Sequence, residues 1–450
     1  MTTRILPLLL LVACGQSGDE PIRAASSPEA QTGAANAGAA ELAAAELAPA
    51  AAPHLAAMAL NAAPLPSPAP LLDVGQPVNW WFAFKFNSNP PFNGCDGGAD
   101  RACTFGGTVQ DYSKFGQQYV YASSTNGALT VGDDCIGDAT TDPLGATFGQ
   151  VYQSANYHFL LWNDQFYDDP TIKGCSDSCS APWGHSKGML AWNDQGQGFV
   201  LQVSTPSWPA SGSSAHPRSS DGNTLGCVKD DDVEVSQHFF SLALSKDDLV
   251  IVLKALANAS VVTDVNNPQI VSNGGPADVQ ALVNALGNKS QSTTLTNDVL
   301  SSGVRLISKP SKLEVPPWQM ISATLGGVPL RVATWWANPE IPTTTDSTPP
   351  ACWDASLANP GPVEIALTGT WDGNSLGLKG GSGPNYNHAK IGVSKDSTHP
   401  YTIFGDMNQQ GALSGNCGSS QNGRGGLFYV LEDPALFTST TALLAGTSSP

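Results

Sequence analysis

The same short pattern occurs twice in this chain of 450 residues, 203 positions apart (388 minus 185). The first copy is His185-Ser-Lys187 and the second is His388-Ala-Lys390. Side chains alternate between the two faces of an extended strand, so each copy places an imidazole and an ammonium on one face. Two such strands meeting around a pseudo-twofold axis would form one pocket with two histidines and two lysines. These groups suit the binding of a phosphodiester and its cleavage through a covalent histidine intermediate.

The two copies align without gaps for six further residues, which adds Asn193 and Asp396 to the same strand faces. Each side chain would orient an imidazole or, in the other interpretation, end its strand in a turn. The sequence leaves both interpretations open, and the two residues are taken as supporting candidates.

The first residues have the composition of an export signal. Arg4 precedes a short apolar run, and a small residue stands before Cys14. This run is too short for a membrane span and is typical of a secretory signal peptide. The sequence Leu-Val-Ala-Cys14 is similar to a bacterial lipobox, which predicts residues 1–14 as a lipoprotein signal with a lipid on Cys14. An ordinary signal peptide cut nearby is the alternative. Both predict export, and the first predicts a lipoprotein anchored to the membrane of the cell envelope or surface.

Residues 15–75 are rich in alanine, proline and serine and contain no aromatic residue before the globular part begins. Such a segment cannot bury enough apolar surface to fold, so we expect a disordered tether. We also expect a loose tail over 438–450. Between them lies enough chain for one large domain or two fused halves, predicted as 76–250 and 251–437.

The chain has nine cysteines, and removal of the lipid site leaves an even number. An even count in an exported protein suggests up to four disulfides, with a pairing that the sequence does not give. Cys175 and Cys179 have half of a zinc spacing, but no matching pair follows them. We therefore expect no metal site and no cofactor. The eight remaining cysteines are Cys95, Cys103, Cys135, Cys175, Cys179, Cys227, Cys352 and Cys417.

Strand-like runs outnumber helical ones. Two helices are predicted, over Lys246–Ala257 after a capping box of Ser245 and Asp248 and over Pro276–Leu286 before a glycine. Mixed strands and helices with one repeated pattern favour a duplicated α+β or α/β fold over a β-sandwich. The predicted strands are Trp80–Phe86, Gln118–Ala122, His158–Trp162, Gly188–Trp192, Gly198–Ser204, Val363–Thr368, Ala389–Val393, Tyr401–Gly405 and Gly426–Leu431.

The formal net charge is −18, from 20 basic and 38 acidic residues. Nucleic-acid enzymes usually bind phosphates with a basic surface, so this charge argues against a polyanionic substrate. A deep pocket that contains Lys187 and Lys390 can still be locally positive. At acidic pH many carboxylates also take up protons, which weakens the repulsion.

Several segments in order along the chain resemble the deoxyribonuclease II family, a branch of the phospholipase D-like fold. The two His-x-Lys signatures carry the resemblance together with the segments Asn79–Phe86, Phe159–Gln165, Gly222–Val228, Gly405–Asn408 and Gly423–Gly426. The resemblance implies two mixed-sheet halves that share one active site. It also implies a DNA endonuclease that needs no metal, works at acidic pH and leaves 3′-phosphate ends, with no protein partner.

The resemblance gives each site residue an expected role. One histidine would attack phosphorus while the other protonates the leaving 5′-oxygen, and superfamily analogy slightly favours His185 over His388 as the nucleophile. Lys187 and Lys390 would stabilise the charge on phosphorus.

Three further residues come from the closing family segments. Asp406 and Asn408 would hydrogen-bond a histidine or the phosphate, with an Asx-turn as the alternative. Arg424 would bind substrate phosphate or else belong to a loop. Asn163–Gln165 would brace the pocket or cap a strand, and a structural use is favoured.

The sequence departs from the animal family members at two positions. Val203 stands where they carry a functionally important histidine, and Asn193 where they carry aspartate. Two alternatives follow: a phospholipase D-like phosphodiesterase for lipids or small diesters, and a non-catalytic nucleic-acid-binding surface lipoprotein. No role is predicted for the remaining histidines His54, His158, His216, His238 and His399.

Overall fold

A computed structural model gives the arrangement of the chain from residue 66 onward. All described residues belong to one compact unit, 62–450. The structure describes residues 66–92, 102–109, 118–133, 135–137, 139–175, 177–220, 222–227, 233–336, 341–409, 415–418 and 421–450. The predicted signal, the lipid site at Cys14 and the tether up to residue 65 lie outside them. Within the described part, no helix is long and apolar enough to span a membrane.

The first of two large sheets has eight strands in the order β3-β2-β1-β7-β6-β5-β4-β8, and every neighbouring pair is antiparallel. Its central strands are buried on both faces, which explains their near-continuous apolar sequences. The strands are β1 (Trp80–Lys85), β2 (Tyr119–Ser123), β3 (Asn126–Val131), β4 (His158–Asn163), β5 (Lys187–Trp192), β6 (Gly198–Val203), β7 (Gln237–Leu244) and β8 (Val271–Ser272).

The second sheet has seven strands in the order β12-β11-β15-β16-β17-β10-β9, and only the β11–β12 pair in it is parallel. A separate hairpin is formed by β13 (Thr368–Trp371) and β14 (Asn374–Gly377). The strands of the second sheet are β9 (Thr296–Val299), β10 (Arg305–Lys309), β11 (Leu330–Ala333), β12 (Val363–Ile365), β15 (Ile391–Ser394), β16 (Tyr401–Gly405) and β17 (Gly426–Glu432).

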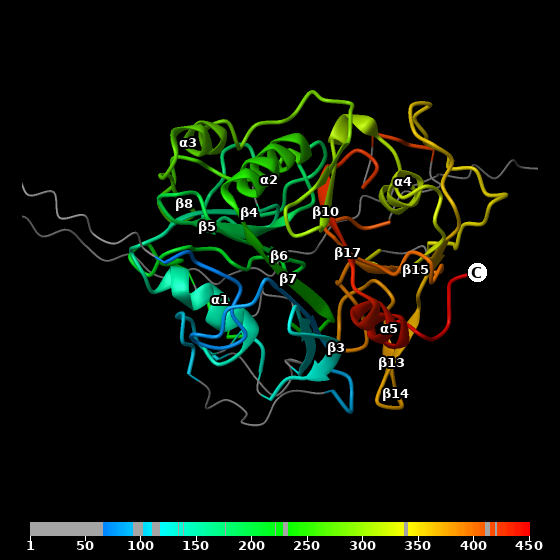
Figure 1. Ribbon diagram of the computed structural model, residues 1–450, viewed down its shortest axis with the longest axis horizontal. Coiled ribbons are helices and arrows are strands. Elements are labelled where there is room, and N and C mark those ends of the chain that lie inside the picture. Colours follow the sequence, from blue (N-terminus) through cyan, green and yellow to red (C-terminus); the bar gives the residue numbers. More distant parts are fainter. Residues whose placement is uncertain are drawn as a thin grey trace, which may run out of the picture. The chain divides into compact units, whose positions relative to one another are not determined.

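Five strands in each sheet follow the chain in the same order. The series β1-β7-β6-β5-β4 in the first sheet corresponds to β10-β17-β16-β15-β11 in the second. Each series has a helix after its first strand, α1 (Pro143–Tyr152) or α4 (Pro317–Thr324), and a helix after its last strand, α2 (Lys246–Ala259) or α5 (Pro434–Leu443). Figure 1 shows α1 and α2 on opposite sides of strands β4 to β7.

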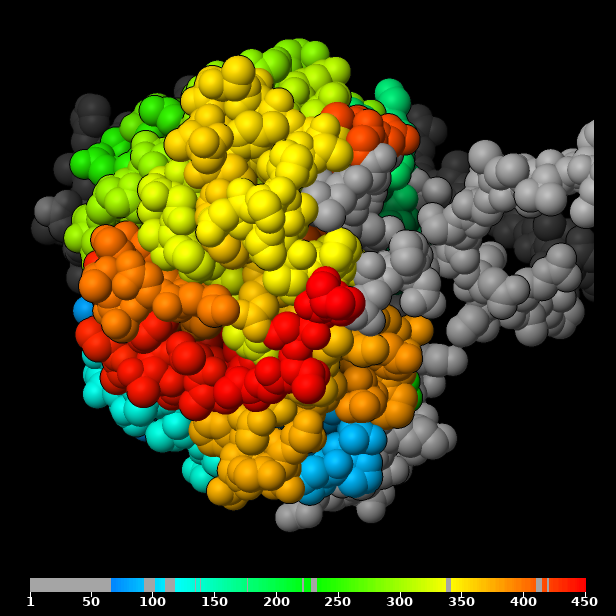
Figure 2. All heavy atoms as spheres, turned by 90° about the vertical axis from the view of Figure 1, so that its right-hand side faces the viewer, coloured from blue at the N-terminus to red at the C-terminus, as the bar shows by residue number. Residues whose placement is uncertain are grey.

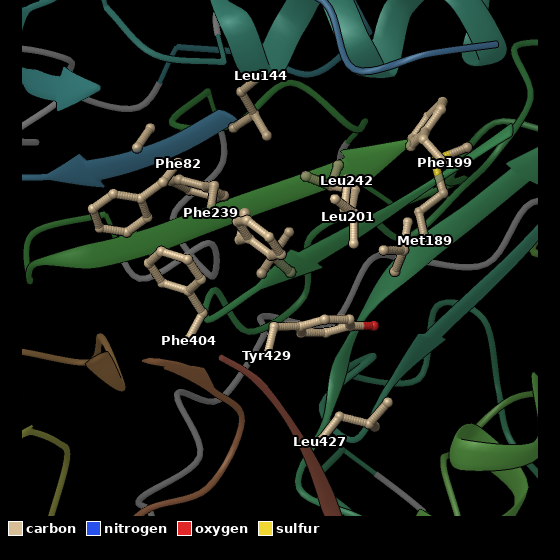
Figure 3. Packing of buried hydrophobic residues seen from close by; sticks show 14 of the residues in the cluster. Phe82, Leu144, Met189, Phe199, Leu201, Phe239, Leu242, Phe404, Leu427 and Tyr429 are labelled. Carbon is tan, nitrogen blue, oxygen red and sulfur yellow. The ribbon is translucent and has the colours of Figure 1, made fainter. Parts of the chain in front are cut away.

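The apolar core includes side chains from both sheets. Phe404 of β16 stacks on Phe82 of β1 and on Phe240 of β7, with ring centroids 4.5 Å apart in each pair. Figure 3 shows Phe404 and Tyr429 of the second sheet next to Phe82 and Leu242 of the first. Full burial of one such side chain contributes about 1.5–3 kcal/mol, so these contacts bind the two sheets to each other.

The helix predictions hold with small shifts at the ends. Ser245 and Asp248 form the predicted capping box at the start of α2, which runs two residues further than expected. The second predicted helix is α3 (Ala277–Asn284), with Pro276 as its N-cap. Each of the nine predicted strands overlaps a strand of the structure, although 363–368 is divided between β12 and β13.

Three expected boundaries differ from the structure. Residue 250 lies inside α2, and β8 still pairs with β4, so the chain changes sheets between β8 and β9. The end of the expected tether is ordered because Leu71 and Thr147 of α1 exchange hydrogen bonds.

The expected loose tail is wrong. Residues 434–443 form α5, whose Leu436 and Leu443 are buried, and Ser448 forms a bridge with Ala366. Arg331 also donates to the hydroxyl of Ser448, so the last residues are bound to the second sheet. The C-terminal residues, red in Figure 2, cover part of this face between the yellow and orange segments.

Three disulfides join cysteines that the structure describes, as the even cysteine count suggested. Their Cα atoms are 6.0, 5.2 and 5.5 Å apart, within the usual range. Cys175 pairs with Cys179, which explains the short spacing without a metal. The pairs are Cys103–Cys227, Cys175–Cys179 and Cys352–Cys417.

Candidate active site

The two histidines of the repeated pattern lie just before equivalent strands and are bound by the opposite half of the chain. The backbone N–H of His185, before β5, donates to the carbonyl of Gly425 at 2.8 Å. The N–H of His388, before β15, donates to the carbonyl of Ser236 at 2.8 Å. Gly425 and Ser236 directly precede β17 and β7, so the two contacts are equivalent in the two halves.

The imidazole rings are fixed in the same reciprocal way. Nδ1 of His185 is 2.7 Å from the carbonyl of Asp406, and Nδ1 of His388 is 2.9 Å from the carbonyl of Ser204. A carbonyl oxygen can only accept, so each Nδ1 carries the proton. In a neutral ring the lone pair is then on Nε2, which is the atom that can react.

Both lysines of the pattern are buried beside these rings. Nζ of Lys187 is 2.5 Å from Oδ1 of Asp164, and Nζ of Lys390 donates to the carbonyl of His388 at 2.5 Å. The pKa of Lys187 lies below its ordinary value because burial disfavours its charge more than Asp164 supports it. Two ammonium groups in this position give the pocket a positive charge inside an acidic protein.

Asp164 and Arg424 form a buried ion pair between the two halves. Nη2 of Arg424 donates to Oδ2 of Asp164 at 2.7 Å and to the carbonyl of Gly184 at 2.8 Å, and Nε donates to the carbonyl of Trp183 at 3.0 Å. Burial favours a higher pKa for Asp164, but Lys187 and the other nearby cations outweigh it and hold the pKa well below its usual range. The carboxylate is therefore ionised, and it fixes Lys187.

Asp406 is buried where the two sheets meet. Its carboxylate accepts from Nε2 of Gln202 at 2.9 Å and from the N–H of Leu427 at 3.0 Å. Burial raises the pKa of Asp406 to about 7, although hydrogen bonds from Ser186, Leu427 and Gln202 oppose the rise. Asp406 thus positions His185 through its backbone carbonyl and ties β6 to the second sheet through its side chain.

The charges around the histidines favour their neutral forms. Burial, followed by Lys187, holds the pKa of His185 well below its usual value, while Asp164 acts in the opposite direction. Burial and Lys390 lower the pKa of His388, and Lys187 and His185 lower it further. Lys390 acts on His185, and Lys187 and His185 act on His388, so charged groups from both halves lie near the two rings.

His238 in β7 is a component that sequence reasoning missed. Its Nδ1 accepts from the backbone N–H of Lys390 at 3.2 Å, which places the ring proton on Nε2. Nε2 is buried without a hydrogen-bond partner among the described residues. Burial and the Lys390 charge lower the pKa of His238, so its ring is neutral and positions Lys390.

The two supporting candidates from the end of the repeated alignment do not reach this pocket. Oδ1 of Asn193 accepts from the N–H groups of Gln195 and Gln197, both at 3.0 Å, in the turn between β5 and β6. Asp396 accepts from Thr398 at 2.9 Å in the equivalent turn between β15 and β16. Both residues come after the ends of their strands, away from the histidines that precede those strands. Their turn interpretation is the one that the structure supports.

Arg424 and Asn408, the two remaining candidates, are both buried. Nε and Nη2 of Arg424 donate to groups of the first half, so this side chain connects the two halves. Asn408 is buried, and its Oδ1 has no hydrogen-bond partner within the described part of the chain.

Asp164, Gln202 and His238 were not predicted as site residues. Asp164 belongs to the family-like segment after β4, which was the signal for it. Gln202 and His238 carry a weaker signal, since each is a polar residue inside an otherwise apolar strand.

Among the described residues, no group of three or more histidine, cysteine, aspartate or glutamate side chains is arranged to hold a metal ion. The site instead combines two imidazoles with the cations Lys187, Lys390 and Arg424 and the carboxylates Asp164 and Asp406.

Comparison with known proteins agrees with this geometry. Residues 70–447 match the sequence profile of the Deoxyribonuclease II family. Deoxyribonuclease-2-alpha from Sus scrofa is 32% identical over 162 residues, a stretch that covers 35% of this chain and 38% of that protein. The chain thus matches less than two thirds of this relative. The family profile, however, spans well over half of the chain, and the protein therefore belongs to the deoxyribonuclease II family.

Proposed function

We propose that this protein is an endonuclease of the deoxyribonuclease II type, which hydrolyses DNA without a metal ion at acidic pH and leaves 3′-phosphate ends. One observation carries the proposal: His185 and His388 come from opposite halves, and a backbone carbonyl fixes each at Nδ1. Each Nε2 is therefore free to exchange a bond with phosphorus or a proton with the leaving group.

The reaction proceeds in two displacements. Nε2 of the neutral histidine forms a bond to phosphorus as the bond from phosphorus to the 5′-oxygen breaks, and the protonated histidine gives its proton to that oxygen. The second histidine, now neutral, takes a proton from water, which attacks phosphorus and releases the first histidine. Lys187 and Lys390 stabilise the negative charge on the phosphoryl oxygens in both steps.

The assignment of His185 as nucleophile remains part of the proposal. Asp164 is the negative neighbour of His185, whereas the charged groups that act on His388 are Lys390, Lys187 and His185. Trapping of the phosphoryl group followed by peptide mapping identifies the histidine that carries it.

We also propose that the two halves are a phospholipase D-like duplication related by a pseudo-twofold axis. The equal order of five strands in each sheet supports it, as do the paired contacts at His185 and His388. Two buried lysines at equivalent strand ends add to this support. Lys85 donates to the carbonyls of Val233 and Val235, and Lys309 donates to those of Asn422 and Arg424.

Export as a lipoprotein anchored through Cys14 is the accompanying proposal for location. The disulfides support an oxidising compartment outside the cytoplasm. Metabolic labelling with a radioactive fatty acid should mark the wild type and leave Cys14→Ser unmarked. Equal labelling of both would exclude this anchor.

The direct test uses plasmid DNA and the purified protein in excess EDTA near pH 5. We expect nicking by the wild type, and a loss on the order of 10²- to 10⁴-fold for His185→Ala and for His388→Ala, because each removes an acid–base or nucleophilic group. Thermal melting should show that both variants stay folded. Activity that returns only with a divalent metal, or a histidine variant with nearly full activity, would contradict the mechanism.

The net charge of −18 favours a second candidate, a phosphodiesterase for lipid or small diesters. A membrane anchor would keep such an enzyme near phospholipid. Parallel turnover of DNA, RNA and phosphatidylcholine vesicles separates the two. Preferential hydrolysis of the lipid would replace the nuclease proposal, while DNA binding without cleavage from pH 4 to pH 8 would indicate a non-catalytic binding protein.

A further inference from the structure

We propose that a groove beside the catalytic pocket binds the phosphodiester backbone of the substrate strand beyond the bond that is cleaved, an inference that rests on the proposed nuclease function. The groove has a volume of about 510 Å³ and lies between the end of α2 and the segment that leads into β9. Its lining is polar and includes Lys254, Asn258, Lys289, Ser290 and Thr294.

The groove is directly connected to the reacting centre. The N–H of Ser290, in the groove wall, donates to Oγ of Ser260 at 2.9 Å, and the carbonyl of Ser260 accepts from the N–H of Gly184 at 2.8 Å. Gly184 directly precedes His185. A strand with its scissile phosphate at His185 therefore has the groove as its neighbouring surface on the side of the first sheet.

Trp183 contacts both a lysine of the groove and an arginine of the candidate site. Nζ of Lys289 lies 5.0 Å from the centre of its indole ring, and the carbonyl of Trp183 accepts from Nε of Arg424 at 3.0 Å. A cation over an indole is held by about 0.5–1 kcal/mol at an exposed site. This contact places the ammonium group of Lys289 at the point where a strand would leave the pocket.

The groove has the charge that a phosphodiester backbone requires. Lys254 and Lys289 are exposed, no acidic side chain lines the groove, and no carboxylate of the described residues is within ion-pair distance of either lysine. Two other exposed lysines are neutralised in ion pairs: Lys246 with Asp278 at 2.8 Å and Lys395 with Glu364 at 2.5 Å. In a protein of net charge −18, two free ammonium groups beside the site attract an anionic strand.

The polar groups around the two lysines serve the wall of the groove. Asn258, Asn288 and Ser292 donate to backbone carbonyls of the groove wall and so hold its shape, which leaves the two ammonium groups as its anion-binding groups. Ammonium groups contact the phosphodiester backbone rather than bases, so the groove gives affinity without sequence preference. Single-stranded and duplex DNA present the same phosphate chemistry, and both serve as substrates in the test.

The test compares Lys254→Gln/Lys289→Gln with the control Lys246→Gln/Lys395→Gln, which changes the net charge equally on exposed lysines outside the groove. The substrates are bis(p-nitrophenyl) phosphate and DNA of roughly 30 nucleotides, single-stranded and duplex. We expect the groove variant to keep wild-type turnover of the small diester. On DNA its KM should rise on the order of 10-fold at low salt. The slope of log(kcat/KM) against log salt should fall by about 1 to 2.

Each other outcome is informative. If the groove variant matches the control on both DNA substrates, the groove proposal is wrong. If the wild type cleaves neither the small diester nor DNA, the proposed nuclease function is itself wrong. Lys254 is also a residue of the α2 helix, so its replacement can change the stability of that helix. If that is its whole role, the variant melts at a lower temperature while KM for DNA is unchanged, which likewise overturns the proposal. A change with one DNA form alone assigns the groove to that form.

Discussion

Asp164 makes the two halves of the pocket chemically different. Lys187 has this carboxylate as its partner, whereas Lys390, its counterpart, donates to the backbone carbonyl of His388. Arg424 completes the difference, because it reaches from the second half to the carboxylate of the first. The symmetric pair of histidines is thereby placed in an asymmetric field, which a reaction with one nucleophile and one acid requires.

Replacement of Asp164 by asparagine keeps the shape and removes the charge. We expect the pKa of His185 to fall further, so the acid limb of the rate profile, which the proposed nucleophile sets, moves to lower pH. Stability should fall by about 3–5 kcal/mol because two buried cations lose their partner. The folded-state pKa of Asp164 lies below its ordinary value, so this stabilisation is present above about pH 4 and is lost at more acidic pH. Profiles of kcat/KM against pH together with thermal melting check both effects, and an unmoved acid limb would contradict this role.

Some site residues were predictable from local sequence and others were not. The histidines and lysines were found because a repeat of a short motif is visible along the chain. Asn193 and Asp396 were predicted from the same strand alternation, but alternation gives at most the face of a strand and not the distance from the histidine. The partnership of Asp164 with Arg424 depends on a contact between residues 260 positions apart, which no local pattern encodes.

At the scale of elements, the end of α2 fixes the entry to β5. A Cβ on Gly184 would lie 2.6 Å from the carbonyl oxygen of Ala259, and one on Gly425 would lie 2.1 Å from the same atom. Glycine is therefore required at both positions for close approach of the backbone. One helix end thus sets the position of His185 and of the carbonyl that holds it.

The variant Gly184→Ala tests this arrangement. The added methyl group meets a backbone atom that cannot move freely, so overpacking should cost about 1–3 kcal/mol of stability. We also expect kcat to fall on the order of 10²-fold, because displacement of a reactive group by about 1 Å has that effect. Thermal melting and single-turnover cleavage measure the two losses. Wild-type cleavage by a variant with lowered stability would show that α2 supports the fold without positioning His185.

Strands were easier to predict than their limits or their partners. Apolar runs identified β1, β5 and β6, because a strand that is buried on both faces has little polar sequence. β7 was not predicted, although it is central, since Gln237, His238 and Ser241 interrupt its apolar run. Those polar residues are tolerated because each is hydrogen-bonded within the sheet or beside the site. The tail prediction failed because the segment is rich in serine and threonine, and only a few leucines pack α5 against the rest of the protein.

For the molecule as a whole, two charges of opposite sign should set the pH response of the proposed nuclease. The net charge of −18 would repel DNA, while burial and the nearby lysines lower the pKa of both histidines. The repulsion should weaken as carboxylates protonate, and the lowered pKa keeps a histidine neutral in mild acid. We expect both effects to favour the proposed activity below neutral pH.

We expect kcat/KM to follow a bell-shaped profile with an optimum at roughly pH 4.5 to 6. Salt should change its height through screening of the body, while the position of the optimum, which the histidine pair sets, should stay the same. Profiles at about 50 mM and 300 mM salt separate the two causes. An optimum above pH 8 at both concentrations would rule out the paired histidines.

The reciprocal backbone hydrogen bonds of the two histidines have a consequence for shortened forms of this chain. The carbonyl that holds His185 belongs to Gly425, close to the end of the chain, and the one that holds His388 belongs to Ser236. A growing or truncated polypeptide that stops before residue 425 lacks half of this framework, whatever else has folded. If the protein is the proposed nuclease, we therefore expect a fragment that ends before residue 425 to be inactive, even where its first sheet has folded.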